Sequence, residues 1–408
     1  MNIWIISVGE PMPFDSGNTR LHRSGLLSQY FSEKGHKVAW ITSTFDHAIK
    51  KNRFSKDTII KYNENIEIHC LHTIVYKNNV GVTRLFSNFV LAFKTYQYLK
   101  KISYPDRIIS SYPILDLAFV AVYYGKKFGV PVLVDVRDLW PDIFLRIFNN
   151  RFLRFLARIC AYPYFLTQKY IFEKATSLVS ITESMLQFCQ RKVYRNERRD
   201  LFFHLAYPIH QIMDSNINKF QEIISHKRSG KVIISFFGNM SLPTCRLDHL
   251  FLAAQKNPTI LDNYCIVFCG NGQSKDYFVD LYKDYSNVYF PGFLDATDIS
   301  TLMSFSDLGF LPYESSFDFQ MSLPNKFVEY LSGGLPVLTC LKGEVQLKLN
   351  EVGSGYFYNT LEDLTHILKQ RNLYLQDGKR EEILKYFQEN FSSDNIYAKY
   401  VSHVEELI

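Results

Sequence analysis

The 408-residue sequence has few cysteines, and their spacing suits neither a metal site nor a disulfide framework. No two form a CxxC pair, and no cysteine–histidine cluster has metal-ligand spacing. The seven cysteines are Cys70, Cys160, Cys189, Cys245, Cys265, Cys269 and Cys340. Scattered thiols in odd number are typical of a reduced cytosolic protein, so we expect free cysteines.

Long apolar runs are also missing. Residues 1–6 are apolar apart from Asn2 but too few for a signal peptide, and Gly9 and Glu10 follow soon after. No stretch of about 18 residues is apolar and uncharged enough to cross a bilayer. We therefore expect a cytoplasmic protein that is soluble or rests on a membrane surface.

Two common nucleotide motifs are absent. The first domain has no GxGxxG with a downstream ribose carboxylate, and GxxxxGK[ST] occurs nowhere in the chain. These absences argue against a nicotinamide-dependent dehydrogenase and a P-loop NTPase. No acidic pair of the DxD type stands at the end of a predicted strand. We therefore expect no metal cofactor.

The composition is that of a globular protein, with 47% apolar and 21% charged residues. Aromatic residues are frequent at 16%, with 34 Phe and 27 Tyr but only 3 Trp. The net charge is +6, so the distribution of charge is more informative than its sum. The length suggests two domains.

Short apolar runs alternate with amphipathic stretches in both halves of the chain. This alternation predicts an α/β fold made of two Rossmann-like, doubly wound domains with a ligand cleft between them. We expect strands at residues 3–8, 37–43, 107–110, 130–136, 178–181, 231–237, 264–269, 287–290, 308–312 and 336–339. The linker is placed within residues 206–230. The domain limits are 1–208 and 209–391, with a helix at about 392–408 that packs back on the first domain.

Three glycine-bearing turns follow predicted strands, and a proline-initiated helix follows further on. The turns contain Gly9 and Gly17, Gly238 with Asn239, and Gly270 with Gly272. Glycine lets the backbone approach a ligand, although turns need glycine anyway. The helix follows Pro324 and carries Lys326 and Glu329. Its free N–H groups and Lys326 would bind a diphosphate, and Glu329 would accept from a ribose diol. The alternative is a capped helix with a surface ion pair.

The order and spacing of these motifs resemble the donor site of retaining glycosyltransferases of family 4, which have the GT-B fold. The matching motifs extend over nearly the whole chain. They are the Gly17 loop and residues 35–38, 135–141, 237–239, 268–272, 291–293 and 324–336. Residues 76–79 with Arg84 are similar to a branch that builds bacterial surface polysaccharides.

The resemblance implies a UDP-sugar or another nucleotide sugar as donor, bound mainly by the C-terminal domain. The donor-binding residues it implies are Gly17, Gly238, Asn239, Arg246, Gly270, Gly272, Phe293, Pro324, Asn325, Lys326 and Glu329. The catalytic residues are Asp138, Arg137 and Lys326. Retention is usually attributed to same-face attack assisted by the donor phosphate. That chemistry needs stabilisation of the departing diphosphate more than a protein nucleophile.

The sequence departs from the family pattern at three positions. Arg137 stands where a histidine is usual, and Met321 replaces the first glutamate of a paired-glutamate motif. Arg246 stands one position away from the place where the family has a cationic clamp for the donor. Two alternatives therefore stay open: a GT-B nucleotide-sugar epimerase, and a non-catalytic nucleotide-sugar-binding subunit.

Two stretches of the first domain, residues 68–105 and 143–172, contain no acid but many basic and aromatic residues. They predict a peripheral contact with the anionic inner face of a membrane, unless they are helices that merely expose a basic face. No nucleic-acid motif accompanies the charge. A lipid-linked sugar diphosphate is the acceptor that fits both this surface and the family resemblance. Arg20, His22 and Arg23 would meet its phosphate, or would be solvated on a helix.

Overall fold

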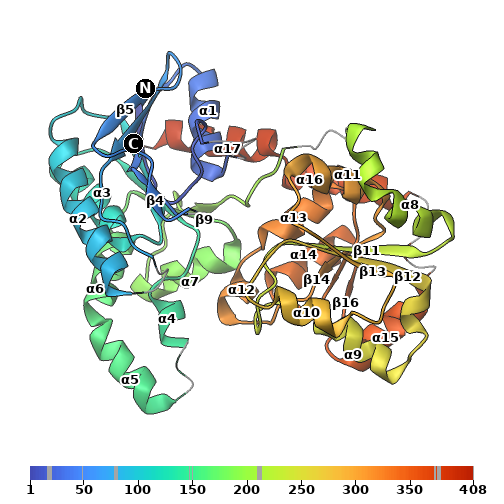
Figure 1. The fold of residues 1–408 in the computed structure, drawn as a ribbon. Helices are drawn as coiled ribbons and strands as arrows, with labels where there is room; N and C mark the ends of the chain where they lie inside the picture. The colour runs from blue at the N-terminus through green and yellow to red at the C-terminus, as the bar shows by residue number, and fades with distance from the viewer. Residues whose placement is uncertain are drawn as a thin grey trace. The chain divides into compact units, whose positions relative to one another are not determined.

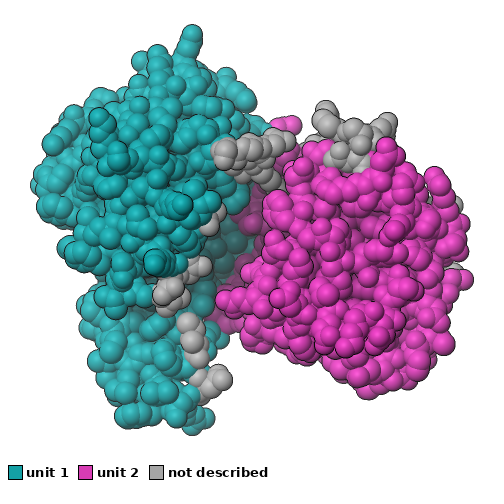
Figure 2. Space-filling model, in the orientation of Figure 1, with its two compact units in different colours: residues 1–204, 396–408 teal, residues 205–395 magenta. Residues whose placement is uncertain are grey.

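The computed structural model of the chain describes residues 1–15, 21–47, 49–77, 81–146, 148, 150–208, 214–371, 374 and 378–407. It divides into two compact units, coloured teal and magenta in Figure 2. Unit 1 comprises Met1–His204 and Ile396–Ile408, and unit 2 comprises Leu205–Asn395. The predicted domain limits were 1–208 with 392–408, and 209–391.

Unit 1 is built on an eight-stranded sheet with the strand order β10-β9-β8-β7-β1-β2-β6-β5. Its strands are β1 (Asn2–Ile6), β2 (Lys37–Ser43), β5 (Thr58–Lys61), β6 (Ile66–Leu71), β7 (Arg107–Tyr112), β8 (Val132–Val136), β9 (Ser177–Ser180) and β10 (Leu201–Phe202). Neighbouring strands are parallel except for β5, which is antiparallel to β6. A separate antiparallel hairpin joins β3 (Phe45–Asp46) and β4 (Lys51–Asn52).

The central strands of this sheet are buried throughout, as β8 shows. Such strands need helices packed on the sheet to cover them. The helices are α1 (Arg23–Glu33), α2 (Val82–Leu99), α3 (Leu115–Phe128), α4 (Asp142–Arg146), α5 (Arg151–Cys160), α6 (Tyr162–Lys174), α7 (Glu183–Val193) and α17 (Ser393–Glu406). Most of α17 belongs to unit 1, where the Tyr400 ring lies 4.9 Å from the Phe203 ring. Figure 1 shows α17 in red beside the blue α1.

Unit 2 contains a six-stranded parallel sheet with the order β13-β12-β11-β14-β15-β16. Its strands are β11 (Val232–Phe237), β12 (Tyr264–Cys269), β13 (Val288–Gly292), β14 (Leu308–Leu311), β15 (Val337–Thr339) and β16 (Gly355–Phe357). Its helices are α8 (Gln221–Arg228), α9 (Asp248–Lys256), α10 (Lys275–Leu281), α11 (Ala296–Phe305), α12 (Phe317–Met321), α13 (Asn325–Ser332), α14 (Glu344–Val352), α15 (Leu361–Lys369) and α16 (Lys379–Asn390). Two 3-10 segments are η1 (Asp214–Phe220) and η2 (Ile260–Asn263).

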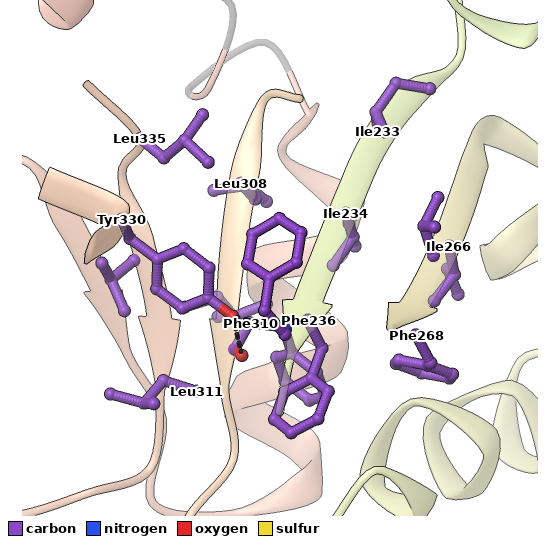
Figure 3. Close-up of a cluster of buried hydrophobic side chains, with 14 of the residues drawn as sticks. Ile233, Ile234, Phe236, Ile266, Phe268, Leu308, Phe310, Leu311, Tyr330 and Leu335 are labelled. Carbon is purple, nitrogen blue, oxygen red and sulfur yellow. Dashed lines mark hydrogen bonds between the residues drawn. The ribbon is translucent and has the colours of Figure 1, made fainter. Parts of the chain in front are cut away.

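The core of unit 2 fixes α13 against the sheet. Tyr330 of α13 points between β14 and β11, and its hydroxyl donates to the Phe310 carbonyl at 3.0 Å (Figure 3). Gly309 makes room for this ring, because a Cβ atom at that position would collide with it. The second turn of this short helix is thereby held at the sheet.

The predicted fold class, two doubly wound α/β domains, is confirmed. Six of the described strands were not expected: β3, β4, β5, β6, β10 and β16. In β6, Glu67 and His69 interrupt the apolar run, yet His69 is buried and hydrogen-bonded to the Tyr98 hydroxyl at 2.6 Å. β10 and β16 are too short to show a pattern. The predicted linker at 206–230 contains η1 and α8. Phe220 and Ile223 are the residues of these two segments described as buried, and they leave little periodicity in the sequence.

Candidate functional site

Two glycine turns meet at the carboxyl ends of β11 and β12 in unit 2. Gly238 and Gly270 both have positive φ angles, +141° and +127°. The Gly238 N–H donates to the Cys269 carbonyl at 2.8 Å, and a Cβ atom on Gly270 would overlap the Gly238 carbonyl. Backbone therefore packs on backbone at Gly270, which only glycine allows there.

Asn239 and Gly272 complete these turns. The Asn239 Oδ1 atom accepts a hydrogen bond from the Ser241 hydroxyl at 2.8 Å. A Cβ atom on Gly272 would lie 2.5 Å from the same Oδ1 atom. The Met240 N–H donates to the Asn271 carbonyl at 2.9 Å, which joins the two turns. Four predicted donor residues are thus brought together.

Lys326, in the first turn of α13, extends over Gly238, where a Cβ atom would overlap its Cε. Its Nζ atom lies 5.3 Å from the centre of the Tyr313 ring and 5.8 Å from that of Phe236. Within the described part of the chain, this ammonium makes no hydrogen bond or ion pair. Burial lowers the pKa of Lys326, an effect that Cys245 and Glu329 oppose. A partly desolvated cation at this place favours an anionic ligand.

The other predicted donor residues of this region lie around the same edge of the sheet. Pro324 is the N-cap residue of α13 and Asn325 is its first residue, one position later than the sequence suggested. Glu329 is buried, with 7% exposure, one turn beyond Lys326. Phe293 directly follows β13 and is 78% exposed. Free helix N–H groups, a cation and a carboxylate therefore occur within one short segment.

Arg246 differs from the predicted cationic clamp. Its guanidinium pairs with Asp248 at 2.8 Å and with Glu314 at 2.7 Å. These two carboxylates already compensate its charge, so Lys326 is the better anion ligand of the two. The enclosure of Lys326 by Tyr313 was missed in the sequence. The only signal of this enclosure in the sequence was Tyr313, an aromatic residue directly after the strand predicted at 308–312.

In unit 1, Arg137 belongs to a buried network of charges. Its Nε atom donates to Asp135 Oδ2 at 2.7 Å, and one terminal nitrogen donates to Glu10 Oε1. Glu10 also accepts hydrogen bonds from Ser7 at 3.0 Å and from Ser24. Burial opposes ionisation of Glu10, but Arg137 and Ser24 outweigh it, and the pKa of Glu10 is lowered. The guanidinium of Arg137 is therefore held in place by carboxylates.

Arg23, predicted to meet the acceptor phosphate, lies inside this network with only 3% exposure. Its Nε atom donates to Asp135 Oδ2 at 3.1 Å, and Nη1 donates to the Phe203 carbonyl at 2.7 Å. The guanidinium also lies 5.0 Å from the centre of the Tyr400 ring. Asp135 in an otherwise apolar strand requires a buried cation, and Arg23 with Arg137 meets that need. An acceptor role for Arg23 stays a prediction that this burial does not favour.

The remaining predicted residues of unit 1 are Asp138, His22, Gly17 and Arg20. Asp138 is half-buried after β8, and its Oδ1 atom accepts from the Leu139 N–H at 2.7 Å. His22 is the exposed N-cap residue of α1 and helps to lower the pKa of Glu10. Gly17 and Arg20 lie outside the described residues.

Unit 1 exposes an unusual number of apolar side chains on its helices. Within α5, Ala157 alone is buried, while Phe152, Phe155 and Ile159 are exposed beside the three arginines of that helix. Figure 1 shows α5 at the periphery of unit 1, away from its sheet. In α2, Phe89 and Phe93 are each 61% exposed. Exposed apolar surface of this extent marks an interaction site.

Two further features concern metals and membranes. Among the described residues, no three histidine, cysteine or acidic side chains are grouped so that they could hold a metal ion. Among the described helices, none is both long enough and apolar enough to traverse a bilayer.

Comparison with known proteins gives structural neighbours only. No protein-family model and no curated protein matches the sequence. Sucrose-phosphate synthase from Thermosynechococcus elongatus aligns with a TM-score of 0.74 at 14% identity, over 100% of this chain and 98% of that one. Anabaena HepE in complex with UDP-glucose aligns at 0.66 and 14%, over all of both chains. WaaG, a glycosyltransferase of lipopolysaccharide biosynthesis, aligns at 0.65 and 15%, also over all of both chains. The chain therefore has the GT-B fold, with two Rossmann-like domains.

Proposed function

We propose that this protein is a glycosyltransferase that moves a sugar from a nucleotide sugar to an acceptor. The observation that carries the proposal is the partly desolvated Lys326 ammonium, which lies beside two glycine turns and a helix start and makes no hydrogen bond or ion pair among the described residues. Such a place suits a diphosphate. The fold supports it, since HepE has this fold and is described in complex with UDP-glucose. A UDP-sugar is therefore the first donor to test.

The residues of unit 2 would act mainly on the leaving group. The bond between the anomeric carbon and the phosphate oxygen breaks, and its electron pair stays on the diphosphate. Lys326 and the N–H groups at the start of α13 stabilise that charge without a metal ion. Glu329 would hold the ribose hydroxyls.

The transferred sugar is proposed to keep its anomeric configuration. The acceptor hydroxyl attacks from the face that the diphosphate leaves, and its proton passes to the departing phosphate oxygen. This path needs no covalent intermediate on the protein. Asp138 and Arg137 in unit 1 are the residues we propose on the acceptor side, with Arg137 positioned by Glu10 and Asp135.

The acceptor is proposed to be lipid-linked, with the protein resting on the inner face of a membrane during polysaccharide synthesis. The support is the surface of α5, where exposed Phe152 and Phe155 alternate with Arg151 and Arg154. Such a helix suits an anionic interface. WaaG and WaaB share the fold and are described as glycosyltransferases of lipopolysaccharide.

The test uses the purified full chain, a panel of nucleotide sugars and a membrane lipid extract, with products identified by mass spectrometry. We expect one donor to be consumed and its sugar to appear on a lipid. Lys326→Met should lower turnover more than donor binding, because its charge acts chiefly on the departing diphosphate. Lys283→Met, at an exposed lysine of the same unit, is the control. Epimerised donor without transfer would instead support the epimerase alternative. Binding without turnover would support a non-catalytic subunit.

A further inference from the structure

Two aromatic rings of unit 2 lie close to the Lys326 ammonium. Its Nζ atom is 5.3 Å from the centre of the Tyr313 ring and 5.8 Å from that of Phe236. Phe236 is the second-last residue of β11, and Tyr313 follows β14 by two residues. These strands are neighbours in the parallel sheet, so their carboxyl ends bring both rings to the same lysine. Phe236 and Tyr313 are here called the ring pair.

The position of the Tyr313 ring is set by contacts within the protein. Tyr313 forms an antiparallel β-bridge with Cys245, and the Arg246 N–H next to it donates to the Pro312 carbonyl at 2.8 Å. The centre of the Tyr313 ring lies 5.1 Å from that of Phe319 in α12, and the residue is only 6% exposed. The ring therefore needs no ligand to hold it in place.

Phe236 belongs to the core of the sheet. It is fully buried, and its ring centre lies 6.5 Å from that of Phe268 in β12 (Figure 3). A change at Phe236 would therefore disturb the core as well as the lysine. Tyr313, at the edge of the core, is the member of the ring pair to change in an experiment.

The ionisable groups around the ammonium differ in charge. Cys245 and Glu329 raise the pKa of Lys326, but burial outweighs them and the pKa is lowered. Burial raises the pKa of Cys245 to about 12, so its thiol is neutral at pH 7. Burial also raises the pKa of Tyr313, which keeps its hydroxyl neutral. Glu329 is thus the one anion of these three groups, and the ammonium makes no ion pair with any described residue.

Arg246 shows the other way in which this unit holds a cation. Its guanidinium pairs with Asp248 at 2.8 Å and with Glu314 at 2.7 Å, so carboxylates compensate its charge. The face of an aromatic ring also attracts a cation within about 6 Å of its centre, but a ring carries no net charge. A ring can therefore position Lys326 and leave its positive charge available to an anionic ligand.

We propose that Tyr313 and Phe236 are positioning residues of the donor site, whose rings hold the Lys326 ammonium beside the glycine turns without neutralising it. The inference rests on the proposed function, because the anion that would meet this charge is the donor diphosphate. A lysine that is already in place loses less side-chain freedom when its ligand binds. The ring pair thereby contributes to donor affinity through the lysine and not through contact with the donor.

The test changes the charge distribution of the ring and keeps its size. Tyr313→Phe keeps the negative ring face, whereas Tyr313→trifluorophenylalanine weakens it in a side chain of nearly the same shape. Titration calorimetry with UDP and the full-length protein should give similar affinities for the native chain and Tyr313→Phe. The fluorinated variant should bind UDP at least about threefold more weakly than Tyr313→Phe. In a Lys326→Met background the two variants should bind UDP equally.

Tyr356 provides a matched control. Its ring, in the edge strand β16 of the same sheet, has Lys379 Nζ 5.7 Å from its centre. Tyr356→trifluorophenylalanine should bind UDP as Tyr356→Phe does. Equal affinities of the two Tyr313 variants would overturn the proposal, because the ring would not act through its attraction for the cation. A fluorine effect that persists with Lys326→Met would also overturn it, since the ring would then act on the ligand directly.

A second readout needs no ligand. The ring face favours the protonated lysine, so the pKa of Lys326 should be lower in Tyr313→trifluorophenylalanine than in Tyr313→Phe. NMR of ¹³C-labelled lysine side chains measures this pKa, and Lys326→Met identifies the signal. Equal pKa values in the two variants would overturn the proposal even if the protein transfers sugar. The expected difference in pKa, found together with no UDP binding and no transfer, would contradict the proposed function alone.

Discussion

Lys326 occupies the space that a side chain on residue 238 would need: a Cβ atom on Gly238 would overlap both Cε and Nζ of the lysine. The turn after β11 and the first turn of α13 are therefore matched to each other. A cation can approach the backbone N–H groups of the turn only because this residue is glycine. The geometry makes Gly238 as important to the proposed donor site as the lysine itself.

Gly238→Ala should displace the Lys326 ammonium and weaken nucleotide-sugar binding at least about tenfold, since a charged hydrogen bond contributes roughly 1.5–3 kcal/mol. The φ angle of +141° adds backbone strain. Titration calorimetry with the donor found in the panel measures the loss. Gly230→Ala is a matched control for strain, because Gly230 also has a positive φ of +84° but open space around it. Equal effects of the two substitutions would remove Lys326 from the explanation.

Donor binding should weaken at alkaline pH, and earlier than an ordinary lysine would allow. Burial lowers the pKa of Lys326 below its usual 10.5, so the ammonium loses its proton at a lower pH in the empty site. A diphosphate attracts only the protonated form. The same shift destabilises the folded, empty protein at neutral pH, and that penalty disappears as pH rises toward 10.5. Calorimetric affinities across this range should decline for the native chain and stay flat for Lys326→Met.

Removal of Arg137 should cost about 3–5 kcal/mol of unfolding free energy, because Glu10 would stay buried without its main cation. Glu10 has a lowered pKa, so its contribution is fully present above the ordinary value of 4.5 and is lost as pH falls through the lowered one. Urea denaturation of Arg137→Met should show both the lower stability and a weaker dependence on acidic pH.

A double substitution separates the structural role of Arg137 from a catalytic one. Glu10→Gln with Arg137→Met should regain part of the lost stability, since the uncompensated charge is gone. An Arg137→Met variant that keeps native stability but loses turnover would point to direct catalysis instead.

Neutralising α5 should detach the protein from anionic vesicles. Each arginine near such a surface contributes about 1 kcal/mol, so replacing Arg151, Arg154 and Arg158 by Gln should lower the partition coefficient about a hundredfold. Stability should not change, because these side chains are exposed. Vesicle sedimentation at two salt concentrations measures this. The control replaces the exposed Lys51, Lys56 and Lys61 of the same unit. If the control detaches equally, net charge and not α5 is responsible.

Excess chelator should leave most transfer activity intact. The charge of the departing diphosphate is met by Lys326 and by helix N–H groups in our proposal. The assay is sugar transfer before and after treatment with EDTA. Complete loss that Mg²⁺ or Mn²⁺ restores would contradict a metal-independent reaction.

The sequence predicted the parallel sheets well, because their strands are short, continuous apolar runs. It also predicted the glycine turns after β11 and β12 and the helix that carries Lys326, because their signals are local in the chain. The donor roles of these residues stay predictions. β6 was missed because polar residues interrupt its apolar run. Its buried His69 looks polar in the sequence, and only the partner Tyr98, which is far away in the chain, makes its burial acceptable.

The environment of each charge could not be predicted, since it depends on contacts between distant residues. Arg246 was expected to face a ligand, but Asp248 and Glu314 hold it. Arg23 was expected at the surface, but Asp135, more than a hundred residues later, binds it inside. A sequence shows that a cationic side chain is present, but it does not show which carboxylate pairs with it.

The return of α17 to unit 1 has a consequence for how this protein is made. On the ribosome, the residues of α1 to β10 emerge long before Tyr400, whose ring lies against Phe203 and the Arg23 guanidinium. Until then, part of the nascent core stays open to water. The N-terminal half must therefore wait for the whole of unit 2 to be translated before it can close. We expect chaperones to bind the N-terminal half of the nascent chain in that interval.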